Sequence, residues 1–389
     1  MKKILTYAAF FAALSYASPA FGEVKFGGDA SVRVRDTSYD LGNNHSKSDD
    51  LYWQYRIRLN AAADLGDGYL FKAQITNEAP NKRSDGTVAI GGGGGWQTVG
   101  YGNTELYSIG ISQAYFGRIK DNYHYLAGRL PLNSTNNPVF DLTLYPSNPG
   151  DIPTTTFDND RLFGFNYGTK VGAGELNVVV GVFDNISAND TGKTGDGLFN
   201  DGYVGLVSYK TNIGGLTVEP VVLTALTKID SFTQNTFSTT SSAYGTAWHQ
   251  GIRPWTFGAN FSGKVGDLKL GASGFYNVGR GTTPNSTSIY GANANAHVDY
   301  SAYLLRIKAE YGPFLAWYDH SVATDKSTSV KNTYTNNFVW AQYQLKPYST
   351  ATASLTIQPT IRYLTNRDEV TPSNNRDRLR SELWATVTF

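Results

Sequence analysis

Cysteine is absent from this chain of 389 residues, and its one methionine is the initiator Met1. The absence of cysteine excludes a disulfide framework and any thiolate metal site. Basic and acidic side chains almost balance, at 33 Lys and Arg against 32 Asp and Glu, so the composition gives no indication of nucleic-acid binding. The five histidines form no His-x-x-x-His pair, and no Gly-x-Ser-x-Gly segment is present. We therefore expect no metal, no cofactor and no catalytic site.

Long hydrophobic runs are missing beyond the first residues. A basic start followed by the apolar stretch 4–17 is typical of a signal peptide. The small residues Ala20 and Gly22 predict cleavage after position 22, which divides the chain into a signal peptide (1–22) and one mature domain (23–389). No later segment is long and apolar enough to form a membrane-spanning helix.

Aromatic residues and glycines are abundant instead. Aromatic residues make up 14% of the chain, including 26 tyrosines, and there are 41 glycines. The mean hydropathy is nevertheless negative, at -0.33. This combination suits a membrane β-barrel, because half of every strand in such a barrel faces water.

The final stretch, 378–389, shows a pattern that recurs throughout the chain. Apolar residues such as Leu379 and Phe389 alternate with polar residues such as Arg380, and Trp384 is the one apolar exception on the polar side. A period of two predicts a strand with one apolar and one polar face. The last strand of a soluble β domain would show the same pattern, but the rest of the chain favours a membrane barrel.

Sixteen segments of this kind predict sixteen strands. They cover 24–35, 53–61, 69–76, 105–118, 123–130, 160–168, 175–184, 201–210, 216–228, 251–264, 268–280, 297–311, 314–323, 335–346, 352–366 and 378–389. Short turns alternate with long polar connections, and aromatic residues gather beside the short turns. The predicted fold is all-β: a transmembrane antiparallel β-barrel with short periplasmic turns and long external loops.

Strand parity places many basic side chains on the inner face of the predicted barrel. The candidate basic residues of the constriction are Arg33, Arg35, Arg56, Arg58, Lys72, Arg118 and Arg129. Further inward cations are Lys25, Lys269, Arg306, Lys308, Arg362, Arg378 and Arg380, against the inward acids Asp29, Glu310 and Glu382. A water-filled lumen keeps such charges solvated, whereas a soluble barrel could not bury so many of them unpaired. The alternative is that they are solvated lumen residues with no role in selectivity.

The long connection 131–160 contains only acidic charges. They are Asp141, Asp151, Asp158 and Asp160. If this loop folds into the barrel, its acids face the candidate basic residues and create a transverse field across the constriction. An ordinary solvated loop is the alternative.

The stretch 113–117, Gln-Ala-Tyr-Phe-Gly, and the later Gly128-Arg129 pair resemble the fourth and fifth strands of the Gram-negative general diffusion porins. The terminal Phe389 resembles the end of their last strand. The resemblance implies a homotrimer, an inward-folded loop, and contacts with outer-membrane lipids and the barrel-assembly machinery. The inward loop of that family often reads Pro-Glu-Phe-Gly-Gly; this chain reads Asn-Pro-Val-Phe-Asp at 137–141, a departure that leaves the fold of the loop open.

These features predict a porin that reaches the outer membrane after export through a cleaved signal peptide. Its channel would pass small hydrophilic solutes and ions by passive diffusion, with a modest preference for anions. A substrate-selective channel of similar fold, with sixteen or eighteen strands, would differ by an aromatic slide along the lumen and by saturable conduction. An outer-membrane enzyme would need a His beside a Ser on the outer face, and a structural or adhesive barrel would have a plugged pore.

Overall fold

The computed structural model describes residues 24–41, 48–77, 96–98, 110–131, 161–184, 202–226, 255–283, 296–326 and 329–389. The predicted signal peptide and the acids Asp141, Asp151, Asp158 and Asp160 lie outside the described residues. Almost all of the described chain is β-strand, and its helical segment is the 3-10 turn Pro372–Asn374. No helix in this part of the chain is long and apolar enough to cross a membrane.

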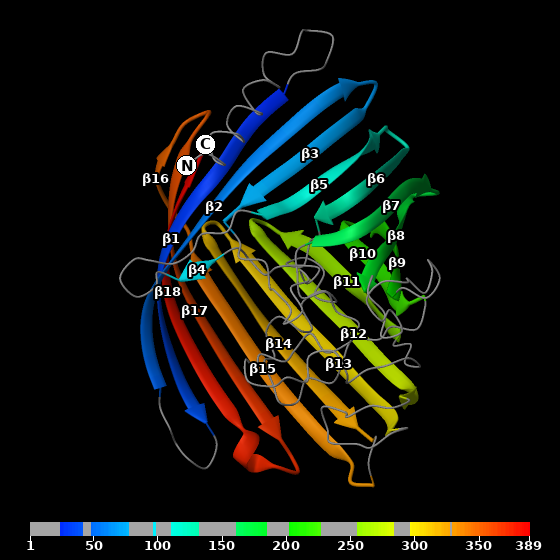
Figure 1. The fold of residues 1–389 in the computed structure, drawn as a ribbon, viewed down its shortest axis with the longest axis vertical. Coiled ribbons are helices and arrows are strands. Elements are labelled where there is room, and N and C mark those ends of the chain that lie inside the picture. Colours follow the sequence, from blue (N-terminus) through cyan, green and yellow to red (C-terminus); the bar gives the residue numbers. More distant parts are fainter. Residues whose placement is uncertain are drawn as a thin grey trace, which may run out of the picture.

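The strands form one antiparallel sheet that closes on itself (Figure 1). They are β1 (Val24–Leu41), β2 (Ser48–Gly66), β3 (Tyr69–Thr76), β4 (Gln97–Thr98), β5 (Gly110–Ile119), β6 (Tyr123–Pro131), β7 (Arg161–Val171), β8 (Gly174–Asp184), β9 (Gly202–Ile213), β10 (Leu216–Ala225), β11 (Trp255–Val265), β12 (Leu268–Thr283), β13 (Ala296–Tyr311), β14 (Phe314–Asp325), β15 (Asn332–Tyr343), β16 (Leu345–Ser349), β17 (Ser354–Asp368) and β18 (Arg376–Thr388). β4 is a two-residue segment beside β2, and β16 continues β15 along their shared neighbour β17. The remaining sixteen strands form the wall, which confirms the predicted barrel.

The barrel closes between the two ends of the described chain. β1 pairs with β18 on one side and with β2 on the other, so the blue β1 runs beside the red β18 in Figure 1. Closure pairs the two edges that an open sheet would leave exposed, and it satisfies backbone groups that could not be left unpaired in lipid.

The last residue, Phe389, completes this seam. Its N–H donates to the carbonyl oxygen of Gly28 at 3.0 Å, and its own carbonyl oxygen accepts from the N–H of Gly28 at 2.7 Å. A Cβ on Gly28 would lie 2.4 Å from the carbonyl oxygen of Arg58 and 3.1 Å from the ring of Phe389. A glycine at this position therefore allows β1, β2 and the terminal aromatic ring to approach one another.

Short turns and long connections alternate along the chain, as predicted. Tight turns join β2 to β3, β5 to β6, β7 to β8, β9 to β10, β11 to β12 and β13 to β14. Several of these turns contain a residue with positive φ, as at Gly68 (79°) and Gly214 (59°), which glycine adopts without strain. Because successive strands are antiparallel, the short turns share one rim and the long connections share the other.

The two faces of the wall differ in polarity. Phe71 of β3 lies in register with Phe116 of β5, and both rings are exposed on the outer face. The outer face carries many such exposed apolar side chains, including Phe163, Phe257, Leu305, Ile361 and Leu383. An apolar outer band is the surface that a barrel presents to lipid.

One short turn lies further along the chain than predicted. The sequence placed it around Pro347, but β16 contains that residue and the turn follows at 350–353. The hydroxyl oxygen of Thr350 accepts the N–H of Ala353 at 3.0 Å and closes this turn. A register shift between Leu345 and Tyr348 accommodates the proline, which has no N–H to donate to the ladder.

Candidate pore-lining site

Four of the predicted basic residues lie together on the inner faces of β1 and β2. In the register of the two strands, Asp29 is opposite Arg58, Ser31 is opposite Arg56, and Arg33 is opposite Gln54. Residues in register share a face of the sheet, so Arg33, Arg35, Arg56 and Arg58 form one cluster on the lumen side. The register agrees with the inner face that parity predicts for these four positions, and their place at the constriction stays a prediction.

Two inward carboxylates hold the cluster in place. The carboxylate of Asp29 forms ion pairs with Arg58 at 2.8 Å and with Arg56 at 3.6 Å. The carboxylate of Glu382 in β18 forms ion pairs with three arginines. They are Arg35, through the arginine Nε, Arg33 at 3.6 Å and Arg362 of β17 at 2.8 Å. The side chain of Glu382 is fully covered, at 0% exposure, so this carboxylate is shielded from solvent while it binds three guanidinium groups.

Closing the barrel extends the basic surface onto β17 and β18. Arg362 lies in register with Arg380, and Arg380 lies in register with Thr37 of β1. Arg378 is two residues from Arg380 and therefore on the same face. We use the name basic wall for Arg33, Arg35, Arg56, Arg58, Arg362, Arg378 and Arg380.

Indole rings lie against the basic wall, and the sequence did not predict them. The Cζ of Arg33 is 4.0 Å from the centroid of Trp96, and that of Arg56 is 4.8 Å from the same ring. The Cζ of Arg362 is 3.9 Å from the centroid of Trp340. The one available signal was Trp384, the apolar residue on the polar face of the last strand, whose indole N–H donates to Glu382 at 3.1 Å.

Lys72 lies on the inner face but outside this cluster. It is in register with Ala62 of β2 and Tyr115 of β5, closer than Arg58 to the turn at Asp67. Its side chain is exposed. Lys72 therefore lines the lumen nearer the short-turn rim, and its predicted place at the narrowest point stays a prediction.

Arg118 and Arg129 were assigned to the wrong face. Arg118 is in register with Tyr69 and shares the outer face of Phe116, where it donates to Asp67 in the neighbouring turn and to the hydroxyl of Tyr123 at 3.0 Å. Arg129 is in register with the outward Phe163. Both arginines are close to the ends of their strands, where a long cationic side chain can reach water from the outer face.

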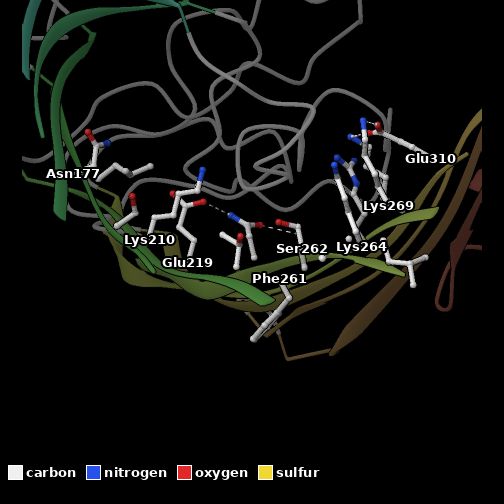
Figure 2. A pocket seen from close by; sticks show the side chains of 18 of the residues that line it. Asn177, Lys210, Glu219, Phe261, Ser262, Lys264, Lys269 and Glu310 are labelled. Carbon is white, nitrogen blue, oxygen red and sulfur yellow. Dashed lines mark hydrogen bonds and ion pairs between the residues drawn. The ribbon is translucent and has the colours of Figure 1, made fainter. Parts of the chain in front are cut away.

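The opposite side of the lumen holds a cavity of about 890 Å³. Figure 2 shows Lys210, Glu219, Ser262, Lys264, Lys269 and Glu310 extending toward it from the wall, whereas Phe261 extends to the other side. The carboxylate of Glu310 forms ion pairs with Lys308 at 2.8 Å and with Lys269 at 3.3 Å. No group of three or more His, Asp or Glu side chains in the described part of the chain could hold a metal ion.

No protein-family model and no curated protein sequence matches this chain. Solved structures do match it. OmpT of Vibrio cholerae, in a form that lacks its loop L8, has a TM-score of 0.53 at 11% identity, over 94% of this chain and 99% of that one. The same protein in its trimer form has a TM-score of 0.51 at 9% identity, over 95% and 99%.

Two further matches are described as channels. The anion-selective porin from Comamonas acidovorans has a TM-score of 0.52 at 10% identity, over 94% of this chain and 99% of that one. The outer membrane channel DcaP of Acinetobacter baumannii has a TM-score of 0.52 at 14% identity, over 96% and 99%. Identities this low establish the fold alone. The chain has the fold of the Gram-negative outer-membrane porins, a closed antiparallel barrel of sixteen strands.

Proposed function

We propose that this protein is a porin whose water-filled channel passes small hydrophilic solutes and ions by passive diffusion, with a modest preference for anions. The observation that carries the proposal is the composition of the basic wall. Its seven arginines come from four adjacent strands of the inner face, and five of them share two carboxylates, Asp29 and Glu382. A net positive lumen raises the local concentration of anions.

Three further features belong to the same proposal. The trimer form of the OmpT match supports a homotrimer, and the description of the Comamonas porin supports anion selectivity. The position of Phe389 at the closing seam supports its role as the terminal signal for barrel assembly. Asp141, Asp151, Asp158 and Asp160 lie outside the described residues, and we propose that neutralising Asp141 and Asp151 strengthens the preference for anions.

The test is the zero-current potential of the purified protein in a planar bilayer across a gradient of KCl. We expect discrete conductance steps and a potential of the sign given by chloride as the more permeant ion. Replacing Arg56 and Arg58 with Gln should move the potential toward zero, because both side chains belong to the basic wall. Arg280→Gln is the matched control, since Arg280 is an exposed arginine that pairs with Asp299 away from this wall.

Two results would refute the proposal. A bilayer that shows no conductance steps would exclude a channel. A cation-selective wild type would exclude the anion preference and would mean that charges other than the basic wall control the entrance.

A further inference from the structure

Four indole rings lie side by side on the inner wall. Trp317 of β14 stacks on Trp340 of β15, with centroids 4.6 Å apart and an interplanar angle of 11°. Trp384 meets Trp340 edge-on at 6.2 Å, and Trp96 meets Trp384 at 5.1 Å. We call these four residues the aromatic lane. Trp317 and Trp340 are buried, at 7% and 6% exposure, so the half-buried Trp384 and Trp96 present the rings that a solute can reach. It is unexpected, because inward positions of a water-filled barrel are normally polar.

The aromatic lane leads directly into the basic wall. One row of the sheet runs through Trp317, Trp340, Arg362 and Arg380, each in register with the next across β14, β15, β17 and β18. Arg362 lies between Trp340 and Arg380 and covers the ring of Trp340. Trp384 follows Arg380 by four residues on the same face of β18, about 13 Å away at a rise of roughly 3.3 Å per residue, a gap that an arginine side chain and a bound aromatic carboxylate can span together. An apolar platform and a cationic group therefore share one stretch of wall.

The two arginines of this row differ in their partners. Arg362 stacks on the indole of Trp340 and binds Glu382 at 2.8 Å through its N–H edge. Within the described residues, no carboxylate lies at ion-pair distance from Arg380. Its Nε is buried without a hydrogen-bond acceptor. The row thus contains a donor that the described protein does not satisfy.

We propose that the aromatic lane with Arg362 and Arg380 is a binding site for aromatic carboxylates, on which the ring of the solute packs against Trp384 and Trp96 while its carboxylate binds Arg380. This inference rests on the proposed channel function and names the solute class that the channel binds. Indole platforms also bind sugars, but sugar recognition needs hydrogen-bond acceptors beside the rings. The carboxylate next to this lane, Glu382, is fully covered and holds three arginines, so the charges around the lane fit an anion.

The experiment measures the chloride current through the channel in a planar bilayer while an organic solute is added. Sodium benzoate is the probe, cyclohexanecarboxylate is a control with the same charge and no aromatic ring, and glucose is a neutral control. We expect benzoate to reduce the current saturably, with a half-saturating concentration about twofold to tenfold below that of cyclohexanecarboxylate, since aromatic contacts contribute roughly 0.5–1.5 kcal/mol. Glucose should leave the current unchanged.

Two variants test the two halves of the site. Arg380→Gln should raise the half-saturating concentration of benzoate about tenfold, because a charge-assisted hydrogen bond is lost. Trp384→Leu should remove the advantage of benzoate over cyclohexanecarboxylate while both anions still reduce the current. Arg280→Gln should change neither value, because Arg280 is an exposed arginine outside the aromatic lane. If one variant does not form a barrel, the other still tests the inference.

Equal reduction by benzoate and cyclohexanecarboxylate in the wild type would overturn the inference, because it would show attraction by charge alone. Saturable reduction by glucose would overturn it in favour of a sugar site. A benzoate response that survives both variants would move the site elsewhere. These outcomes differ from a failure of the proposed function, which would appear as a bilayer without any conductance.

Discussion

Glu382 is the carboxylate on which the charge balance of the basic wall depends. It is covered and binds Arg33, Arg35 and Arg362, so Glu382→Gln leaves three guanidinium groups without their shared counter-ion. We expect a loss of about 3 kcal/mol in the free energy of unfolding, which is the usual cost of breaking a buried ion pair, together with a stronger anion preference in the folded channels. Urea unfolding in detergent measures the first effect and the zero-current potential measures the second.

Glu310→Gln provides the comparison, because Glu310 is partly exposed while it pairs with Lys269 and Lys308. Solvent screens such a pair, so this variant should lose less than about 1 kcal/mol. Equal losses in the two variants would mean that Glu382 does not organise the basic wall.

Asp67 gives the turn between β2 and β3 a dependence on pH. The Lys120 ammonium, by its hydrogen bond to Asp67, and Arg118 nearby hold the pKa of this carboxyl below its usual value. A lowered pKa in the folded state means that the unfolded chain binds more protons, so the contribution is full above the unfolded pKa and disappears as the pH falls through the folded value. We expect Asp67→Asn to be less stable than the wild type at pH 7 and equal to it at the acid end of the range.

Asparagine suits this comparison because it tolerates the positive φ of 51° at position 67. Unfolding curves from pH 7 down to acid conditions measure the difference. A gap between the two proteins that stays constant with pH would show that the effect comes from the backbone of the turn and not from the charge.

At the scale of the elements, the closing seam depends on close contact between β1, β2 and the last residue. A Cβ on Gly28 would lie 2.4 Å from the carbonyl oxygen of Arg58, so Gly28→Ala must displace the backbone of one strand. Gly263→Ala is the matched control, because its nearest neighbour, a side-chain atom of Leu216, would be 3.6 Å from the new Cβ. We expect Gly28→Ala to lower the yield of heat-modifiable barrel on gels while Gly263→Ala resembles the wild type.

Most elements could be predicted from the sequence because every wall strand alternates with a period of two. The same alternation placed Arg33, Arg35, Arg56 and Arg58 correctly on the inner face. It failed for Arg118, which parity assigned to the inner face but which shares the outer face with Phe116. At the end of a strand, an outward arginine can bond to a turn residue such as Asp67. The face of the wall to which a side chain belongs is therefore predicted best in the middle of a strand and worst at its ends.

The contacts of the site could not be predicted, because they depend on how the barrel closes. Arg35 and Glu382 are 347 residues apart in sequence and meet only because β1 pairs with β18 in one register. Alternation gives the face of a residue but not the row to which it belongs. The position of Trp340 beside Arg362 follows in the same way from the register of β15 and β17.

At the scale of the whole molecule, the barrel separates an apolar outer surface from a lumen whose charge is uneven. The basic wall occupies the side formed by β17, β18, β1 and β2, and the cavity of Figure 2 lies along β6 to β13. On that second side, Lys269 and Lys308 share Glu310, so the basic charge there is partly neutralised within the wall. Within the described residues, the larger excess of basic over acidic side chains on the inner face therefore lies on the side of the basic wall.

This arrangement predicts how anion preference depends on salt. The screening length falls from about 30 Å at 0.01 M salt to about 3 Å at 1 M, so the basic wall acts across the lumen only in dilute solution. We expect the ratio of chloride to potassium permeability, taken from zero-current potentials at a constant tenfold KCl gradient, to be highest at the lowest salt and to approach the ratio of the free mobilities near 1 M. Replacing Arg56 and Arg58 with Gln should flatten this dependence, whereas Arg280→Gln should follow the wild type. A permeability ratio that does not change with salt would assign the preference to binding at short range, as at Arg380, because contacts at hydrogen-bond distance are screened far less than a field that crosses the lumen.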